Sequence, residues 1–192
     1  MFLVFPRIRL RISVFAIPSL LIMLWIEGVL PFSILIFSAL IHEIGHLAAM
    51  RLLGYRARRI DVLPMGALIV CPEGIRYLHE TVIALSGPFA SILTSCAAFC
   101  VYAISKDNAV FFVAFINLLL GAFNLMPIEK LDGGKALYCF LSYKNKEDRR
   151  RITSAASYVA KLAIFILVTV ALISSGGNLG AIVLSLALLM QT

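Results

Sequence analysis

The feature that most constrains the fold is a series of long apolar runs without charge. Residues 81–104 hold 24 consecutive residues with no Asp, Glu, Lys or Arg. A helix needs about 20 predominantly apolar residues to cross a bilayer core. The chain of 192 residues is 61% hydrophobic and 14% charged, whereas soluble domains are about a quarter charged. This composition excludes a soluble globular protein and a disordered one, and four cysteines are too few for a secreted disulfide scaffold.

We therefore predict an all-α polytopic membrane protein that forms a single domain over residues 1–192. It has about six transmembrane helices, of which the fourth is broken by Pro127 and a cluster of charges. The basic N-terminus lacks a small-residue cleavage site, so we expect an uncleaved first helix. The predicted spans cover residues 12–27, 32–53, 81–104, 108–143, 152–173 and 179–190.

One segment, residues 60–74, is too short and too interrupted to cross the membrane. Two prolines and two glycines bracket a β-prone stretch at residues 67–71. Both ends of the segment lie on the same side of the membrane in the predicted topology. Non-helical backbone is tolerated at membrane depth only where protein or water satisfies its hydrogen bonds. We therefore expect a small membrane-inserted β-hairpin at residues 60–74.

The distribution of charge predicts the orientation. The net charge is +7, and 13 of the 17 basic residues fall in three clusters, whereas the alternate connections hold only Lys106. Basic loops stay in the cytoplasm, so we expect both termini there. No soluble segment is long enough to carry a nucleic-acid-binding face, which excludes a nucleic-acid partner. The clusters are Arg7, Arg9 and Arg11; Arg51, Arg56, Arg58, Arg59 and Arg76; and Lys144, Lys146, Arg149, Arg150 and Arg151.

Residues 42–46 read His-Glu-Ile-Gly-His, an HExxH motif inside the second apolar run. On a helix, His42 and His46 share one face, so both imidazoles can bind one metal ion, with Glu43 beside them as a general base. Three such side chains without partners in hydrocarbon would cost several kcal/mol. The alternative is a helix end at which the histidines contact lipid headgroups. That position would explain a polar side chain at His46 but not at His42. The motif therefore predicts a metal site.

A catalytic zinc ion takes three protein ligands and keeps one position open. Helical rise places His42 roughly 13 Å, and Asp132 roughly 18 Å, from the basic residues at the cytoplasmic side. Both therefore approach that side from within the membrane. Gly133 and Gly134 allow close backbone packing after Asp132. We favour Asp132 as third ligand over a role as a helix cap. The other candidates are Glu129, His79, Glu80 and Glu73.

Two further motifs follow the HExxH sequence. Residues 124–127 read Asn-Leu-Met-Pro and residues 131–134 read Leu-Asp-Gly-Gly, which together form NxxPxxxxDG. In this order and spacing the motifs resemble those of the site-2 protease family of intramembrane zinc metalloproteases. Residues 63–67 (Leu-Pro-Met-Gly-Ala) resemble the family's hairpin, and residues 86–88 (Ser-Gly-Pro) resemble its next helix. The resemblance covers nearly the whole chain.

The resemblance implies a metalloendopeptidase with one zinc ion per chain. It implies a membrane-associated or transmembrane protein substrate, cut near the cytoplasmic face, and regulatory membrane proteins as partners. Asn124 either contacts substrate or caps the break in the fourth span. The site residues implied are Glu43 as catalytic base, His42, His46 and Asp132 as metal ligands, and Asn124, Pro64 and Gly66 as substrate contacts.

Within the family, the chain is most similar to the stage-IV sporulation type, which processes a membrane-associated pro-sigma factor. We expect the form without that type's cystathionine-β-synthase-like domain. This resemblance implies regulated intramembrane proteolysis in the bacterial cytoplasmic membrane, or in the membrane that surrounds the forespore. Glu129 and Lys130 stand where the family more often has apolar residues.

Two other functions would also use a zinc site in a membrane. A metal transporter predicts polar residues along the outer halves of the spans, which hold almost none. A pseudoprotease that only binds its partners predicts the loss of Glu43 or of a ligand, and none is lost. Peptide-bond hydrolysis is therefore the favoured function.

Overall fold

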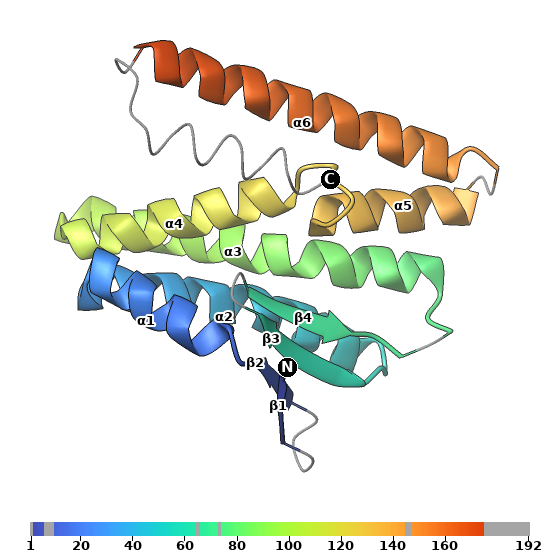
Figure 1. Ribbon diagram of the computed structural model, residues 1–192, viewed down its shortest axis with the longest axis horizontal. Coiled ribbons are helices and arrows are strands. Elements are labelled where there is room, and N and C mark those ends of the chain that lie inside the picture. The colour runs from blue at the N-terminus through green and yellow to red at the C-terminus, as the bar shows by residue number, and fades with distance from the viewer. Residues whose placement is uncertain (1, 6–9, 64–65, 73, 145–146, 175–192) are drawn as a thin grey trace.

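The computed structural model describes residues 2–5, 10–63, 66–72, 74–144 and 147–174. These residues form a mostly helical protein with one small sheet, as predicted (Figure 1). The helices are α1 (Ala16–Glu27), α2 (Val29–Leu52), α3 (Tyr77–Ser105), α4 (Asn108–Asn124), α5 (Asp132–Lys144) and α6 (Arg149–Ser174). The strands are β1 (Phe2–Phe5), β2 (Leu10–Ser13), β3 (Arg59–Leu63) and β4 (Gly66–Val70).

Helix α3 is the centre of the bundle. It packs against α2, α4 and α5, while α6 contacts α5 at the outside (Figure 1). Small side chains allow the close approach of α2, because an added Cβ at Gly45 would lie 2.6 Å from the Ser86 carbonyl oxygen and 2.8 Å from the Ala90 Cβ. Interfaces between membrane helices favour small residues for the same reason.

Among the described residues, two helices, α2 and α3, are long and apolar enough to cross a membrane by length and composition. The helices α1 and α4 are apolar but shorter. The predicted break in the fourth span is present, since α4 ends at Asn124 and α5 begins at Asp132. The sixth predicted span, residues 179–190, lies outside the described residues. The number of crossings stays a prediction.

The predicted start of the first span at Ile12 is wrong. Ile12 belongs to β2, and α1 begins four residues later at Ala16. The four residues of β2 read Leu-Arg-Ile-Ser and alternate apolar with polar side chains, a pattern that suits a strand. Their backbone pairs in parallel with β3, with Leu10 opposite Ile60 and Ile12 opposite Val62. This pairing with a distant segment decides the conformation over the apolar composition.

The predicted hairpin is present as the antiparallel pair β3–β4. The prediction did not include β1 and β2, which extend the hairpin to a sheet of the order β1-β2-β3-β4. Two strands alone are at best marginally stable in water, and the added strands supply further backbone hydrogen bonds. Among the described strands, β4 is the last in the order opposite β1, and Figure 1 shows it beside α2 and α3.

We predict that Gly45→Ala lowers the thermal stability of the detergent-solubilised protein. The added methyl group must push α2 away from α3, and overpacking of this kind costs about 1–3 kcal/mol. The control is Ile44→Ala, at an adjacent side chain that is 59% exposed. An unchanged melting temperature for Gly45→Ala would contradict the close α2–α3 contact.

Candidate metal centre

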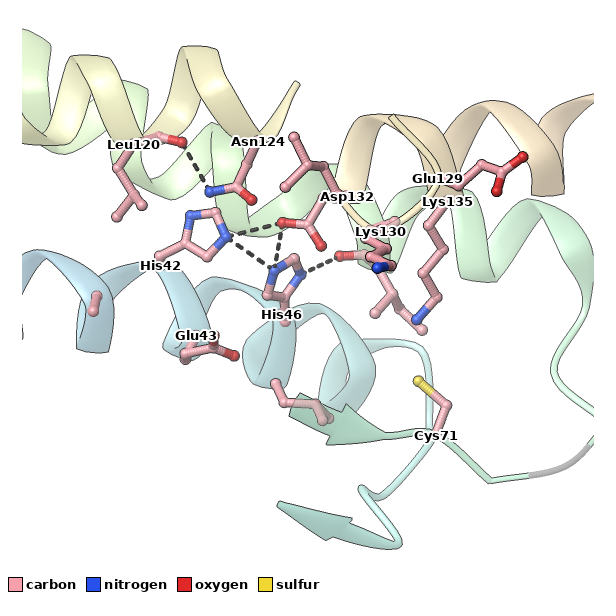
Figure 2. A pocket seen from close by; sticks show the side chains of 15 residues that line it. His42, Glu43, His46, Cys71, Leu120, Asn124, Glu129, Lys130, Asp132 and Lys135 are labelled. Carbon is pink, nitrogen blue, oxygen red and sulfur yellow. Dashed lines mark hydrogen bonds and ion pairs between the residues drawn. The ribbon is translucent and has the colours of Figure 1, made fainter. Parts of the chain in front are cut away.

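The described residues enclose a cavity of about 480 Å³ between α2, α3, α4, α5 and the end of β4 (Figure 2). Most of the predicted site residues line this cavity, although they come from distant parts of the sequence. Its walls also include apolar side chains. The lining residues are Ala39, His42, Glu43, His46, Ile69, Cys71, Ile83, Ala84, Leu120, Asn124, Glu129, Lys130, Leu131, Asp132 and Lys135.

Two histidines and one aspartate converge at one point of this cavity (Figure 2). The distance from Asp132 Oδ2 is 2.9 Å to His42 Nε2 and 3.2 Å to His46 Nε2. The two Nε2 atoms are 3.3 Å apart. Both histidines are buried and Asp132 is partly buried. The structure therefore brings together the two motifs, which are 90 residues apart between His42 and Asp132.

The position of the histidines follows from the periodicity of α2. Its buried residues recur at every fourth position and form one stripe along the helix. His42 and His46 are the two polar aromatic members of this stripe, so the helix alone places both rings on the face that meets α3. The buried residues of α2 are Ile34, Ser38, His42, His46 and Met50.

The position of Asp132 follows from the two glycines after it. An added Cβ at Gly133 would overlap the Leu125 carbonyl, and one at Gly134 would overlap the Ile128 carbonyl. With no Cβ present, residues 125–131 fold tightly against the first turn of α5. The backbone bond from Leu131 N to Ile128 O, at 2.8 Å, closes this turn. Asp132 thereby becomes the first residue of α5 and faces α2.

The hydrogen bonds of the His46 ring determine which of its nitrogens carries the proton. His46 Nδ1 lies 2.7 Å from the carbonyl oxygen of Ile83. A carbonyl oxygen can only accept, so Nδ1 donates and the neutral ring presents its Nε2 lone pair toward Asp132. Gly87 makes room for this ring, because an added Cβ there would overlap it.

These residues fit a zinc ion. In the neutral ring that a metal ion requires, with Nδ1 donating, His46 Nε2 and Asp132 Oδ2 are both acceptors, yet they lie only 3.2 Å apart. A cation between them turns this repulsion into attraction. Two imidazole nitrogens and one carboxylate oxygen are a usual zinc set that leaves a fourth position open. The ligand atoms of His42, His46 and Asp132 all lie within 4.8 Å of one another.

The remaining predicted site residues are placed as follows. Glu43 is half-buried and lines the same cavity beside the histidines. Asn124 also lines it, and its Nδ2 donates to the Leu120 carbonyl oxygen at 3.0 Å, which favours a role at the helix end. Gly66 begins β4, and Pro64 lies outside the described residues.

The alternative ligands considered from the sequence are directed elsewhere. Glu129 accepts a hydrogen bond from Ser154 at 2.9 Å. His79 pairs with the Tyr55 hydroxyl at 3.0 Å, and Glu80 accepts from the Cys139 thiol at 3.2 Å. Glu73 lies outside the described residues.

Sequence reasoning missed the contribution of α3 to the site. The Ile83 carbonyl, the space at Gly87 and the Ser91 hydroxyl all meet the two histidine rings. These three positions are spaced by four residues, so the sequence does place them on one face of a helix. The resemblance of residues 86–88 (Ser-Gly-Pro) to a family motif marks part of this face, but the sequence does not show that the face meets the two histidine rings.

A pair of histidines one helical turn apart, a distant carboxylate and an adjacent glutamate define a metallopeptidase-type site in a helical membrane fold. The comparisons agree with this class. Residues 31–108 and 103–169 match the model of peptidase family M50, and the chain belongs to this family. The resemblance to the site-2 proteases is thereby confirmed.

Individual relatives support the assignment. The chain is 28% identical over 148 residues to the zinc metalloprotease MJ0392 of Methanocaldococcus jannaschii, covering 74% of this chain and 43% of that protein. It is 30% identical over 145 residues to the stage IV sporulation protein FB of Bacillus subtilis, covering 72% of this chain and 50% of that protein. The chain thus spans half or less of the length of these relatives.

A solved structure supports the fold. The site-2 protease from Methanocaldococcus jannaschii superimposes with a TM-score of 0.67 at 23% identity, over 98% of this chain and 91% of that one. At this level of identity the match shows a common fold.

We predict that Asp132→Ala weakens or abolishes zinc binding, because it removes one of the three ligand atoms. Wild-type protein purified in detergent should hold about one zinc ion per chain. The control is Glu129→Ala, since Glu129 lines the same cavity but hydrogen-bonds Ser154. Full zinc content in Asp132→Ala would exclude Asp132 as a ligand, and a loss confined to Glu129→Ala would assign that role to Glu129.

Proposed function

We propose that this chain is a zinc-dependent intramembrane endopeptidase. Its substrate is a membrane-associated or transmembrane protein, cleaved near the cytoplasmic face. The convergence of His42, His46 and Asp132 in a cavity that Glu43 also lines is the observation that carries the proposal. Membership in peptidase family M50 and the resemblance to named zinc metalloproteases support it.

In this proposal, His42, His46 and Asp132 hold the zinc ion and Glu43 transfers protons. Bound zinc supplies a Lewis acid that polarises a carbonyl oxygen and acidifies water. The Glu43 carboxylate accepts a proton from the attacking water as the new C–O bond forms. It then delivers that proton to the amine nitrogen as the peptide C–N bond breaks. The place of Glu43 among the residues that line the cavity, next to His42 in the sequence, supports this role.

Strand β4 is the proposed substrate platform. A transmembrane substrate hides its amides in a helix and must unwind before attack. Ile69 of β4 and Cys71, which follows it, line the cavity, and β4 is the terminal strand of the described sheet. An extended segment that pairs with this edge would present its backbone to the site. In this proposal the substrate-binding residues are Asn124, Pro64 and Gly66, which contact the extended substrate segment.

The membrane arrangement is part of the same proposal. The chain crosses the bacterial cytoplasmic membrane six times as a single domain, with both termini and the three basic clusters in the cytoplasm. The identity of 30% to the stage IV sporulation protein FB supports a sporulation role, with a pro-sigma factor as substrate, regulatory membrane proteins as partners and the forespore-surrounding membrane as location.

We predict that Glu43→Gln lowers cleavage by about 10²–10⁴-fold, the usual contribution of general acid–base catalysis. Its zinc content should match that of the wild type, since the three ligand atoms are unchanged. The measurement is immunoblotting of a tagged membrane substrate co-expressed with each variant. The control is Glu80→Gln, because the Glu80 carboxylate accepts a hydrogen bond from the Cys139 thiol.

The panel of substrates should include a pro-sigma factor and unrelated single-span proteins. Cleavage of a single-span protein but not of the pro-sigma factor would reject the sporulation role and keep the endopeptidase. Full cleavage by Glu43→Gln would reject the mechanism. An absence of cleavage across the panel by zinc-loaded wild type would favour a zinc-binding protein without peptidase activity.

A further inference from the structure

Ser91 of α3 contacts His42 on the side of the ring away from Asp132. Its Oγ lies 3.0 Å from His42 Nδ1, and its side chain has no exposed surface. The residue lies 49 positions from His42 in the sequence, so only the packing of α3 on α2 creates the contact. His42 therefore has a close polar neighbour at each nitrogen, Ser91 at Nδ1 and Asp132 at Nε2.

The two histidines differ in what holds their Nδ1 atoms. His46 Nδ1 meets a carbonyl, which forces it to donate. His42 Nδ1 meets a hydroxyl, which can accept or donate. Only when Ser91 accepts does His42 carry its proton on Nδ1 and present a lone pair at Nε2. That lone pair is what a metal ion requires.

We propose that Ser91 is a positioning residue for the metal centre. Its Oγ accepts from His42 Nδ1, orients the imidazole and fixes the tautomer in which Nε2 binds zinc. Hydrogen bonds of this kind to metal-binding histidines fix the ring and raise its basicity. The inference rests on the zinc site of the proposed function, although it is independent of whether the protein cleaves peptides.

Helix α3 provides a matched control one turn further along. Ser95 is 1% exposed, and its hydroxyl donates to the Ala114 carbonyl oxygen of α4 at 2.7 Å. Ser91→Ala and Ser95→Ala therefore delete the same atom from two buried sites on the same helix. Both variants lose a buried hydrogen bond, but only Ser91→Ala affects His42. Ser91→Thr retains the hydroxyl and tests whether that group alone is needed.

The experiment measures zinc affinity by chelator competition on the full chain in detergent. We expect Ser91→Ala to bind zinc about 10–100-fold more weakly than wild type, the usual cost of losing such a partner. Ser95→Ala and Ser91→Thr should keep wild-type affinity. The visible absorption of the cobalt-substituted protein, which reports ligand geometry, should change in Ser91→Ala and not in Ser95→Ala. Thermal unfolding of each variant checks that it is folded.

Four results would overturn the inference. Wild-type zinc affinity in Ser91→Ala would show that the hydroxyl is not needed. An equal loss of affinity in Ser95→Ala would show a general effect of weakened packing, and an equal loss in Ser91→Thr would show a steric effect. Full cleavage by Glu43→Gln with weak zinc binding by Ser91→Ala would reject the proposed mechanism and leave this inference standing. A wild-type protein that binds no zinc would reject both.

Discussion

The structure depends on the need to partner polar side chains inside an apolar bundle. Two imidazoles and a carboxylate buried in such a bundle cost several kcal/mol if they are left unpaired. Here His42 meets Ser91 and Asp132, and His46 meets Ile83 and Asp132. Each ring is thus oriented at its Nδ1, by Ser91 or by the Ile83 carbonyl, and a cation between Nε2 and Asp132 would stabilise the other side. The same contacts aim Nε2 of each histidine at one point.

Close helix packing makes these contacts available. The absence of a Cβ at Gly45 and at Gly87 lets α2 and α3 approach until their side chains interlock. The absence of a Cβ at Gly133 and Gly134 lets the loop after α4 fold onto α5. The site therefore rests on positions that carry no side chain at all. An added Cβ at Gly87 would overlap the His46 ring itself, whereas one at Gly45, Gly133 or Gly134 would meet the neighbouring backbone that positions the site.

Much of the site could be predicted because its signals are local. The i, i+4 spacing of His42 and His46 fixes their common face wherever the helix lies. The proline and glycines that break the fourth span, and the β3–β4 hairpin, were likewise readable from neighbouring residues. The errors arose where partners are distant: residues 10–13 form a strand because β3 pairs with them, and the apolar composition around Ile12 suggested a helix. Likewise, nothing near Ser91 in the sequence shows that it meets His42.

The sequence by itself determined the apolar helices, the pair of histidines and the break before Asp132, since each follows from the period of a helix or from the conformational limits of proline and glycine. Only the tertiary structure decided that Asp132 joins the histidines, with Glu129, His79 and Glu80 turned to other partners. It also decided the four-stranded sheet and the partners of the two imidazoles. Such contacts depend on which helix faces meet and how closely, and that is a property of the whole packed bundle.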